Sequence, residues 1–172
     1  RELFVAGDSA GGGLTLTLIA WARDAGLRAA SGAIAISPGV DMTFSSPTFK
    51  ANLKTDRMLG PSLEWFFKTP RSIRLLLIWV LNRTTPPNPL ISPIFGNLSD
   101  LPPVLIQASE AEMMLGDARR YVNKARAAGS LAELETWPEM LHVWHLFEPI
   151  LPEAREALER IGRFVERCAG DH

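Results

Sequence analysis

LFVAGDSAGGGLTLTLIA, residues 3–20, is the stretch of the chain that decides the fold. It begins with an apolar run at residues 3–7, which predicts a buried strand, and it ends in a segment with apolar residues at helical spacing, which predicts a helix over residues 12–25. The turn between them matches Gly-x-Ser-x-Gly, a pattern typical of a strand that reverses sharply into a helix and presents one serine. We therefore predict that Ser9 stands alone at the carboxyl end of a strand, where it can act as a nucleophile.

The residues around this serine have predictable physical purposes. We expect Gly7 and Gly11 to keep side chains out of a crowded turn, which forces the serine into a strained backbone conformation. The amide of Ala10, at the N-terminus of the following helix, can stabilise a developing oxyanion. A phosphate-binding loop is the competing glycine-rich pattern, but it requires a lysine after the glycines, and Leu14 follows them here.

The rest of the chain alternates short apolar runs with helical patterns. Further strands are predicted at residues 32–38, 104–108 and 134–137, and further helices at residues 117–128 and 152–168. Strands separated by helices predict a mostly parallel sheet with helices on its faces, which is the α/β class. We expect a single domain over residues 1–172.

One region departs from this alternation. Residues 41–90 are rich in proline, serine and asparagine, and we expect an irregular excursion near the active site, with short helices at about 59–68 and 71–82. Its most apolar part, Ile73–Leu81, is far shorter than the ~20 residues that span a bilayer. We therefore predict a buried or lid helix there and no membrane span.

Composition narrows the class of protein. The chain has 172 residues, 47% of them hydrophobic, and a net charge of −1, so no basic field favours binding to nucleic acid. A single cysteine, Cys168, cannot form a disulfide within the chain, and nothing in this cysteine usage indicates an oxidising compartment. We therefore expect a cytoplasmic globular protein.

A nucleophilic serine needs a base, and the sequence offers three histidines. His172 is the last residue, where chains fray. His142 and His145 follow the strand predicted at 134–137, and a loop after a strand is where a base would lie in this type of sheet. We favour His142, because His145 falls in the next helical segment and can serve as a packing residue.

The base in turn needs an orienting carboxylate, expected between the serine and the histidine in chain order and after another strand. The segment after residues 104–108 offers Glu110, Glu112 and Asp117. Asp117 can simply cap the next helix, and Glu110 can be a solvated loop charge. We favour Glu112, because the apolar residues after it would turn it inward.

These residues resemble the hormone-sensitive-lipase-like family of α/β-hydrolase esterases, in its bacterial branch. The stretches that carry the resemblance are VAGDSAGGGL, AISPGVDMT, NPLISPIFGNLSDLPPVLIQ and HVWHLF. In one branch of the family the acid segment reads Glu-x-Leu-Leu-Asp-Asp, which Glu112-Met-Met-Leu-Gly-Asp117 resembles, with Gly116 in place of the first aspartate. The resemblance implies that Glu112 is the catalytic acid, that no metal or organic cofactor is needed, and that short-chain carboxylic esters are the substrates.

The sequence also departs from the family. The family has a His-Gly-Gly-Gly stretch upstream of the serine that supplies most of the oxyanion hole, and no such stretch occurs in these 172 residues. The resemblance therefore implies that the N-terminal strands and part of the cap are missing. The strand at residues 3–7 would then be an exposed sheet edge, open to pairing with a second copy or with another chain.

Three functions remain open at this point. The first is a serine carboxylesterase with Ser9, His142 and Glu112 as its triad and Ala10 as an oxyanion donor. The second is a catalytically impaired remnant or ligand-binding module, and the third is a half-domain that depends on a partner. Four apolar residues of the excursion could line an acyl or alcohol pocket, although each can equally be core or lid packing: Phe66, Phe67, Leu76 and Trp79.

Overall fold

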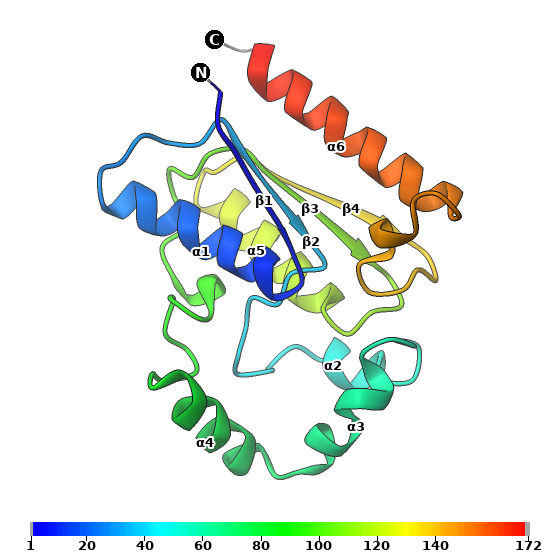
Figure 1. Ribbon diagram of the computed structural model, residues 1–172. Helices are drawn as coiled ribbons and strands as arrows, with labels where there is room; N and C mark the ends of the chain where they lie inside the picture. The colour runs from blue at the N-terminus through cyan, green and yellow to red at the C-terminus, as the bar shows by residue number, and fades with distance from the viewer. Residues whose placement is uncertain (1, 171–172) are drawn as a thin grey trace.

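Four parallel strands form one sheet in the order β1-β2-β3-β4 (Figure 1). The structure is a computed structural model that describes residues 2–170, so His172 lies outside the described residues. The strands are β1 (Phe4–Asp8), β2 (Gly32–Ile36), β3 (Val104–Ser109) and β4 (Ala132–Trp137). The predicted α/β class and the parallel sheet are confirmed.

Helices cover both faces of this sheet. On one face lie α1 (Ala10–Asp24) and α5 (Leu115–Ala127), and on the other lies α6 (Pro152–Gly170) (Figure 1). Alternate residues of the strands pack against opposite layers, as the two-residue period of a strand requires. Thus Ala33 and Ala35 belong to the core with α1 and α5, whereas Ile34 packs with Phe164 of α6.

Three elements begin two residues earlier than the sequence prediction. Helix α1 begins at Ala10 rather than residue 12, so the helix starts directly after the serine. Helix α5 begins at Leu115 rather than residue 117, and β4 begins at Ala132 rather than residue 134. Position 129 has a φ of +88°, which glycine adopts without strain and which explains why α5 ends just before it.

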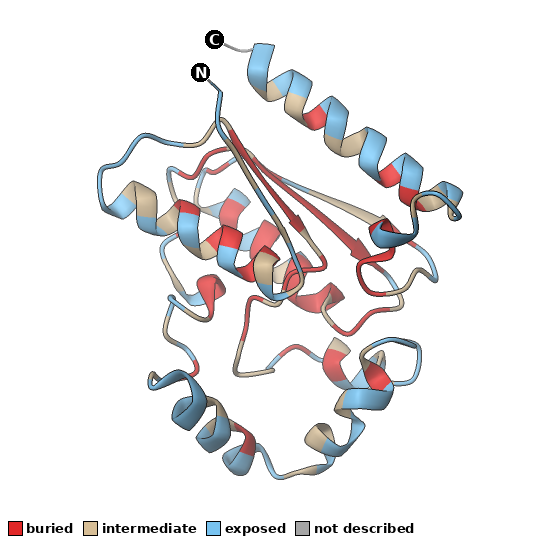
Figure 2. Cartoon of the chain, viewed as in Figure 1, coloured by how far each residue is buried: buried red, intermediate tan, exposed pale blue. Residues whose placement is uncertain are grey.

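The excursion lies beyond the carboxyl ends of the strands (Figure 1). It contains α3 (Gly60–Lys68) and α4 (Arg71–Asn82), close to the predicted ranges, and a short helix α2 (Thr48–Ala51) that the sequence analysis did not predict. Short 3-10 helices follow at η1 (Pro93–Phe95) and η2 (Trp144–Phe147). Most of α4 is exposed, in contrast to the buried strands β2 and β3 (Figure 2).

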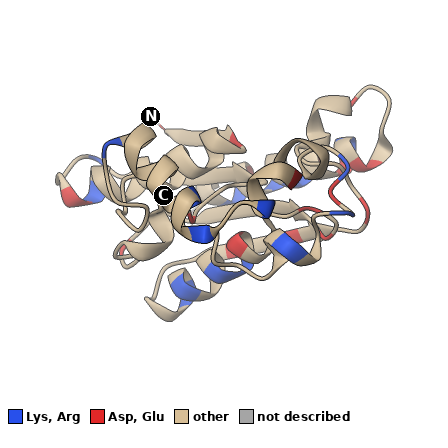
Figure 3. Ribbon diagram, turned by 90° about the horizontal axis from the view of Figure 1, so that it is seen from below, with Lys and Arg blue, Asp and Glu red and all other residues tan. Residues whose placement is uncertain are grey.

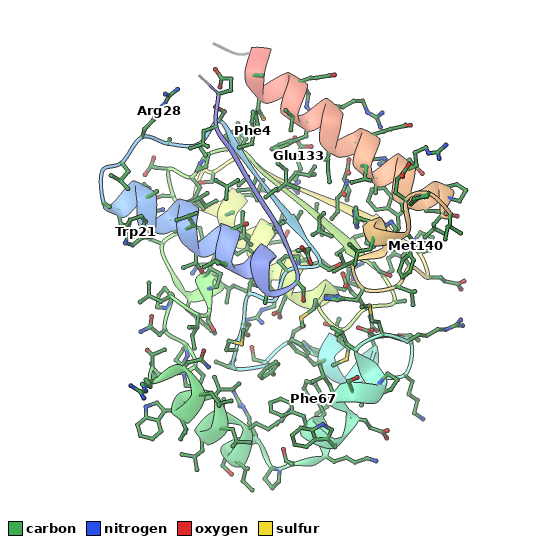
Figure 4. All side chains as sticks on the ribbon, viewed as in Figure 1. Phe4, Trp21, Arg28, Phe67, Glu133 and Met140 are labelled. Atoms are coloured by element: carbon green, nitrogen blue, oxygen red, sulfur yellow. The ribbon has the colours of Figure 1, made fainter. Side chains whose placement is uncertain are left out.

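Strand β1 is an edge strand among the described residues, because it pairs only with β2. Several large apolar side chains are exposed beside this edge, just before β1 and on the outer side of α1: Leu3, Leu14, Leu18 and Trp21. Three of them border a cavity of about 320 Å³, and Trp21 is labelled in Figure 4. The sheet therefore presents an apolar border on the β1 side.

The described residues show neither a surface of one charge sign in the view of Figure 3 nor a helix apolar enough to span a membrane. Both basic and acidic residues occur on the face drawn in Figure 3. Within residues 2–170, no helix combines the length and the apolar composition that a membrane span requires.

Candidate active site

Ser9 occupies the sharp turn between β1 and α1. Its backbone has φ 51° and ψ −116°, a conformation that L-residues adopt only under strain. Three backbone hydrogen bonds hold it there. The Ser9 N–H donates to Ile36 O at 2.8 Å, and Ser9 O accepts the N–H groups of Gly13 at 3.2 Å and of Gly39 at 3.4 Å. The neighbouring strand β2 and the first turn of α1 thus impose the strain.

Only one of the two motif glycines is sterically required. A Cβ at Gly7 would overlap the carbonyl oxygen of Gly11 and lie 2.8 Å from the Thr15 hydroxyl. A Cβ at Gly11 would meet nothing within 4 Å, so the expectation that Gly11 also keeps a side chain out of the turn is wrong. The crowding arises because the backbone at position 11 itself fills the space beside Gly7.

His142 lies in the loop after β4 and faces the serine. Its Nε2 is 2.8 Å from Ser9 Oγ, and its Nδ1 is 2.7 Å from Glu112 Oε2. An ionised carboxylate only accepts hydrogen bonds, so the Nδ1 proton points at Glu112 and the Nε2 lone pair accepts the Ser9 O–H. The ring is 2% exposed, so the orientation is protected from water.

Glu112 lies in the loop between β3 and α5, and its side chain is fully buried. Its Oε1 accepts the backbone N–H of Ser109 at 2.9 Å, while Oε2 meets His142. Both carboxylate oxygens therefore have a partner, as a buried charge requires. The structure brings together the three residues that the sequence analysis favoured, from the carboxyl ends of β1, β3 and β4.

Ala10 is the first residue of α1, so its N–H has no carbonyl within the helix to bind. It follows Ser9 directly and lies at the positive end of the helix dipole. This position suits a donor to an oxyanion formed at the serine.

The other candidate acids lie elsewhere. Glu110 is exposed, and its carboxylate accepts the Thr136 hydroxyl at 3.1 Å. Asp117 is fully buried, but it does not cap α5 as the sequence allowed, because its Oδ2 accepts the backbone N–H of Val40 at 3.2 Å. Burial, together with the charge of Asp41, raises the pKa of Asp117 to about 7.

Asp41 carries the negative charge of this buried pair of carboxyls. Arg120 Nη1 lies 2.7 Å from its Oδ2, and the hydroxyls of Thr43 and Ser45 also donate to it. Burial would raise the pKa of Asp41, but the hydrogen bonds from Ser45, Thr43 and Arg120 outweigh it and hold the pKa below its usual value. The pair ties the loop after β2 to the first turns of α5.

His145 is a buried packing residue rather than a base. Its Nε2 lies 2.8 Å from Gln107 Oε1, and its ring lies against Trp144 with the centroids 4.1 Å apart. Burial lowers the pKa of His145 to about 4, although the charge of Asp8 opposes this shift. A neutral ring whose Nε2 proton is given to Gln107 cannot activate Ser9.

A family model of the α/β-hydrolase fold matches residues 1–146. The chain belongs to the α/β-hydrolase family. The resemblance to the hormone-sensitive-lipase branch is also confirmed. A solved esterase from the bacterial hormone-sensitive lipase (HSL) family is 34% identical, with a TM-score of 0.82 over 95% of this chain and 52% of that one. The solved structure of EstE5 soaked with p-nitrophenyl butyrate is 40% identical, with a TM-score of 0.83 over 96% of this chain and 53% of that one.

Curated relatives agree in class. An acetyl-hydrolase of Streptomyces hygroscopicus is 36% identical over 97% of this chain and 53% of its own length. The carboxylesterase/phospholipase LipF of Mycobacterium tuberculosis is 32% identical over 99% of this chain and 45% of its own length. The chain therefore spans about half the length of the curated relatives that it matches.

The four apolar residues that the sequence suggested as pocket lining divide into two groups. Phe66 and Phe67 pack with Phe44 and Phe49, and the guanidinium of Arg74 lies 5.0 Å from the Phe67 ring centroid. Figure 4 labels Phe67. Part of this cluster borders a cavity of about 280 Å³. In contrast, Leu76 is 56% exposed and Trp79 is 51% exposed, so the expectation that these two line a pocket finds no support.

Within residues 2–170, no group of three His, Cys, Asp or Glu side chains is arranged to hold a metal ion.

A set of polar side chains between residues 48 and 56 binds the loop around Glu112, and the sequence did not predict it. Short polar side chains are common in turns, so they give little signal of such a role.

Proposed function

We propose that this chain carries the catalytic triad of a serine carboxylesterase that cleaves short-chain carboxylic esters. Ser9 is the nucleophile, His142 the general base and acid, and Glu112 the residue that orients the imidazole. The single observation that carries the proposal is the continuous pair of hydrogen bonds from Ser9 Oγ through the His142 ring to Glu112. The base lies within hydrogen-bond reach of the nucleophile, and a carboxylate orients the base, which is the arrangement that activates a serine.

The proposed reaction has two steps. In the first, Ser9 Oγ bonds to the acyl carbon while His142 Nε2 takes its proton, and the same proton passes to the alkoxy oxygen as the ester C–O bond breaks. In the second, water loses a proton to His142 and attacks the acyl carbon, and Ser9 leaves with that proton. Glu112 stabilises the imidazolium at both stages by accepting a hydrogen bond from the Nδ1–H, and it does not itself take the proton.

The Ala10 amide is the proposed oxyanion donor. One donor of this kind is worth ~10²–10³ in rate, or about 3–4 kcal/mol. The family pattern places further donors on an upstream His-Gly-Gly-Gly stretch that these residues do not include. We therefore expect the isolated chain to turn over esters slowly relative to its full-length relatives.

Hydrolysis of p-nitrophenyl butyrate by the purified chain, compared with Ser9→Ala, tests the proposal. We expect turnover that disappears in Ser9→Ala and persists in Ser62→Ala, which removes an exposed hydroxyl from α3. A fluorophosphonate, which phosphonylates activated serines with loss of fluoride, provides a second, single-turnover readout at Ser9. Turnover and labelling equal in wild type and Ser9→Ala would overturn the proposal.

The alternative is a half-domain that depends on a partner, or an impaired, ligand-binding form of the same fold. The exposed apolar residues beside edge strand β1, namely Leu3, Leu14, Leu18 and Trp21, favour it. Parallel sheets are normally buried, so such an edge is suited to pairing with a second copy or with another chain. Sedimentation velocity over a range of concentrations tests this: self-association supports pairing between copies, and a monomer at all concentrations argues against it.

We also propose that the protein is located in the cytoplasm. The basis for this proposal is the cysteine usage alone, since the single Cys168 cannot form a disulfide within the chain.

A further inference from the structure

The loop that carries Glu112 is held from outside by the excursion. Residues 110–116, which we call the acid loop, link β3 to the first turn of α5. Residues 48–56, which we call the holding segment, comprise α2 and the turns that follow it. Side chains of the holding segment make six hydrogen bonds to backbone groups of the acid loop, at 2.8–3.0 Å.

Two of the six hydrogen bonds hold the peptide unit that follows Glu112. Asn52 Nδ2 donates to Glu112 O at 2.9 Å, and the N–H of Met113 donates to Asp56 Oδ2 at 3.0 Å. The carbonyl of Glu112 and the N–H of Met113 belong to one planar peptide unit. Partners at both the C=O and the N–H of this unit restrict its rotation, and the orientation of the unit sets the direction in which the Glu112 side chain leaves the backbone.

The remaining bonds spread this restraint along the loop. The same Asn52 amide donates to Glu110 O at 2.9 Å, and the Thr55 hydroxyl donates to Ala111 O at 2.9 Å. The Thr48 hydroxyl donates to Met113 O at 2.8 Å and accepts the N–H of Gly116 at 3.0 Å. None of these bonds uses the Glu112 carboxylate, which stays available to His142 and Ser109.

Gly116 provides an independent sign that the two segments fit together. A Cβ at this position would overlap the Ser46 hydroxyl and lie 2.5 Å from Thr48 Oγ1. The Ser46 and Thr48 hydroxyls therefore occupy the space that a side chain at position 116 would need. This explains why the chain has glycine where the related acid segment has aspartate.

We infer that the holding segment keeps Glu112 aligned with His142, and that Asn52 and Asp56 are positioning residues for the triad. The inference rests on the proposed function, because Glu112 matters to hydrolysis only through His142. The excursion would then act on the triad itself, because a displacement of the holding segment would misalign Glu112 with His142. Misplacement by about 1 Å can cost ~10²-fold in rate.

The test is Asn52→Asp, which keeps the size of the side chain and removes both N–H donors to the acid loop. We expect kcat for p-nitrophenyl butyrate to fall ~10–100-fold with KM nearly unchanged. We also expect loss of the low-field proton NMR resonance of the His142 Nδ1–H that is bound to Glu112. Lys54→Ala is the matched control, because Lys54 is exposed on the same turn and, among the described hydrogen bonds, makes none to the acid loop.

The outcomes separate this inference from the proposed function. A folded Asn52→Asp chain with the wild-type resonance would overturn the inference, and so would a wild-type chain that lacks the resonance. A wild-type chain without Ser9-dependent turnover would contradict the proposed function alone, and the resonance would still decide the inference. If Asn52→Asp does not fold, Thr55→Val removes one of the six bonds and is expected to weaken the resonance in the same direction.

Discussion

Replacing Gly7 by alanine is expected to destabilise the turn that holds Ser9. The new Cβ would lie 2.5 Å from the carbonyl carbon of Gly11, whereas ordinary contacts begin at 3.4 Å, so the backbone must move by about 1 Å. Overpacking of this kind costs ~1–3 kcal/mol, and loss of the Ser9 N–H bond to Ile36 O would add ~1 kcal/mol. We therefore expect a total loss of ~2–4 kcal/mol, a large part of the 5–15 kcal/mol that typically stabilises a domain.

Gly11→Ala is the matched control, because it changes the other glycine of the same motif. Its Cβ would enter open space, and alanine is the better helix former, so we expect a gain of up to ~1 kcal/mol. Equilibrium unfolding in urea, followed by tryptophan fluorescence, measures both free energies of unfolding. The reasoning would be refuted by a Gly7→Ala chain within ~0.5 kcal/mol of wild type, or by equal losses in the two variants.

Three further predictions concern the buried acids and histidines. Glu112→Gln is expected to lower kcat ~10²–10⁴-fold, since the imidazole loses its orienting charge, whereas Glu110→Gln should leave kcat unchanged; equal effects in the ester assay would contradict the assignment of the acid. Asp117 keeps its proton up to about pH 7 in the folded chain but only to about pH 3.8 when unfolded. Its contribution to the free energy of unfolding is therefore greatest in acid. That contribution is lost as the pH rises through 7, by up to ~4 kcal/mol. Urea unfolding at pH 5 and pH 8 should show a loss between these values that Asp117→Asn reduces, and an unchanged loss would count against the role of burial and the Asp41 charge. His145 behaves oppositely: its folded pKa of about 4 lies below the unfolded 6.5, so stability is complete above pH 6.5 and declines by up to ~3 kcal/mol as the pH falls through 4. His145→Asn should flatten that acid-side decline in the same unfolding measurements, and a decline as steep as in wild type would exclude His145 as its source.

Local sequence signals predicted much of this structure. The turn around Ser9 is encoded within five residues, because the strand, the glycine and the helix start are neighbours in the chain. The preference for His142 over His145 also followed from local position, since only the former lies in the loop directly after a strand. The geometry brings Ser9, Glu112 and His142 together, and their catalytic roles stay predictions.

The sequence did not predict the side-chain contacts between residues that lie far apart in the chain. Asn52 and Asp56 resemble ordinary loop residues, and their partners lie about sixty positions further along the chain. Asp117 looks like a helix cap until the fold places Val40 beside it. The one usable signal was Gly116, which departs from the related acid segment. Its cause is visible only in the fold, where the Ser46 and Thr48 hydroxyls occupy the space of a side chain at position 116.

The hydrogen bond between Ser9 and His142 joins residues 133 positions apart. Every strand and both layers of helices must be in place before these two side chains can meet, and parallel sheets with such distant contacts fold slowly. Reactivity at Ser9 is therefore expected to appear last during refolding, after secondary structure has formed. A serine-directed probe added at intervals during refolding would label only the molecules that have completed the topology. It would therefore measure the rate of folding as well as the reactivity of Ser9.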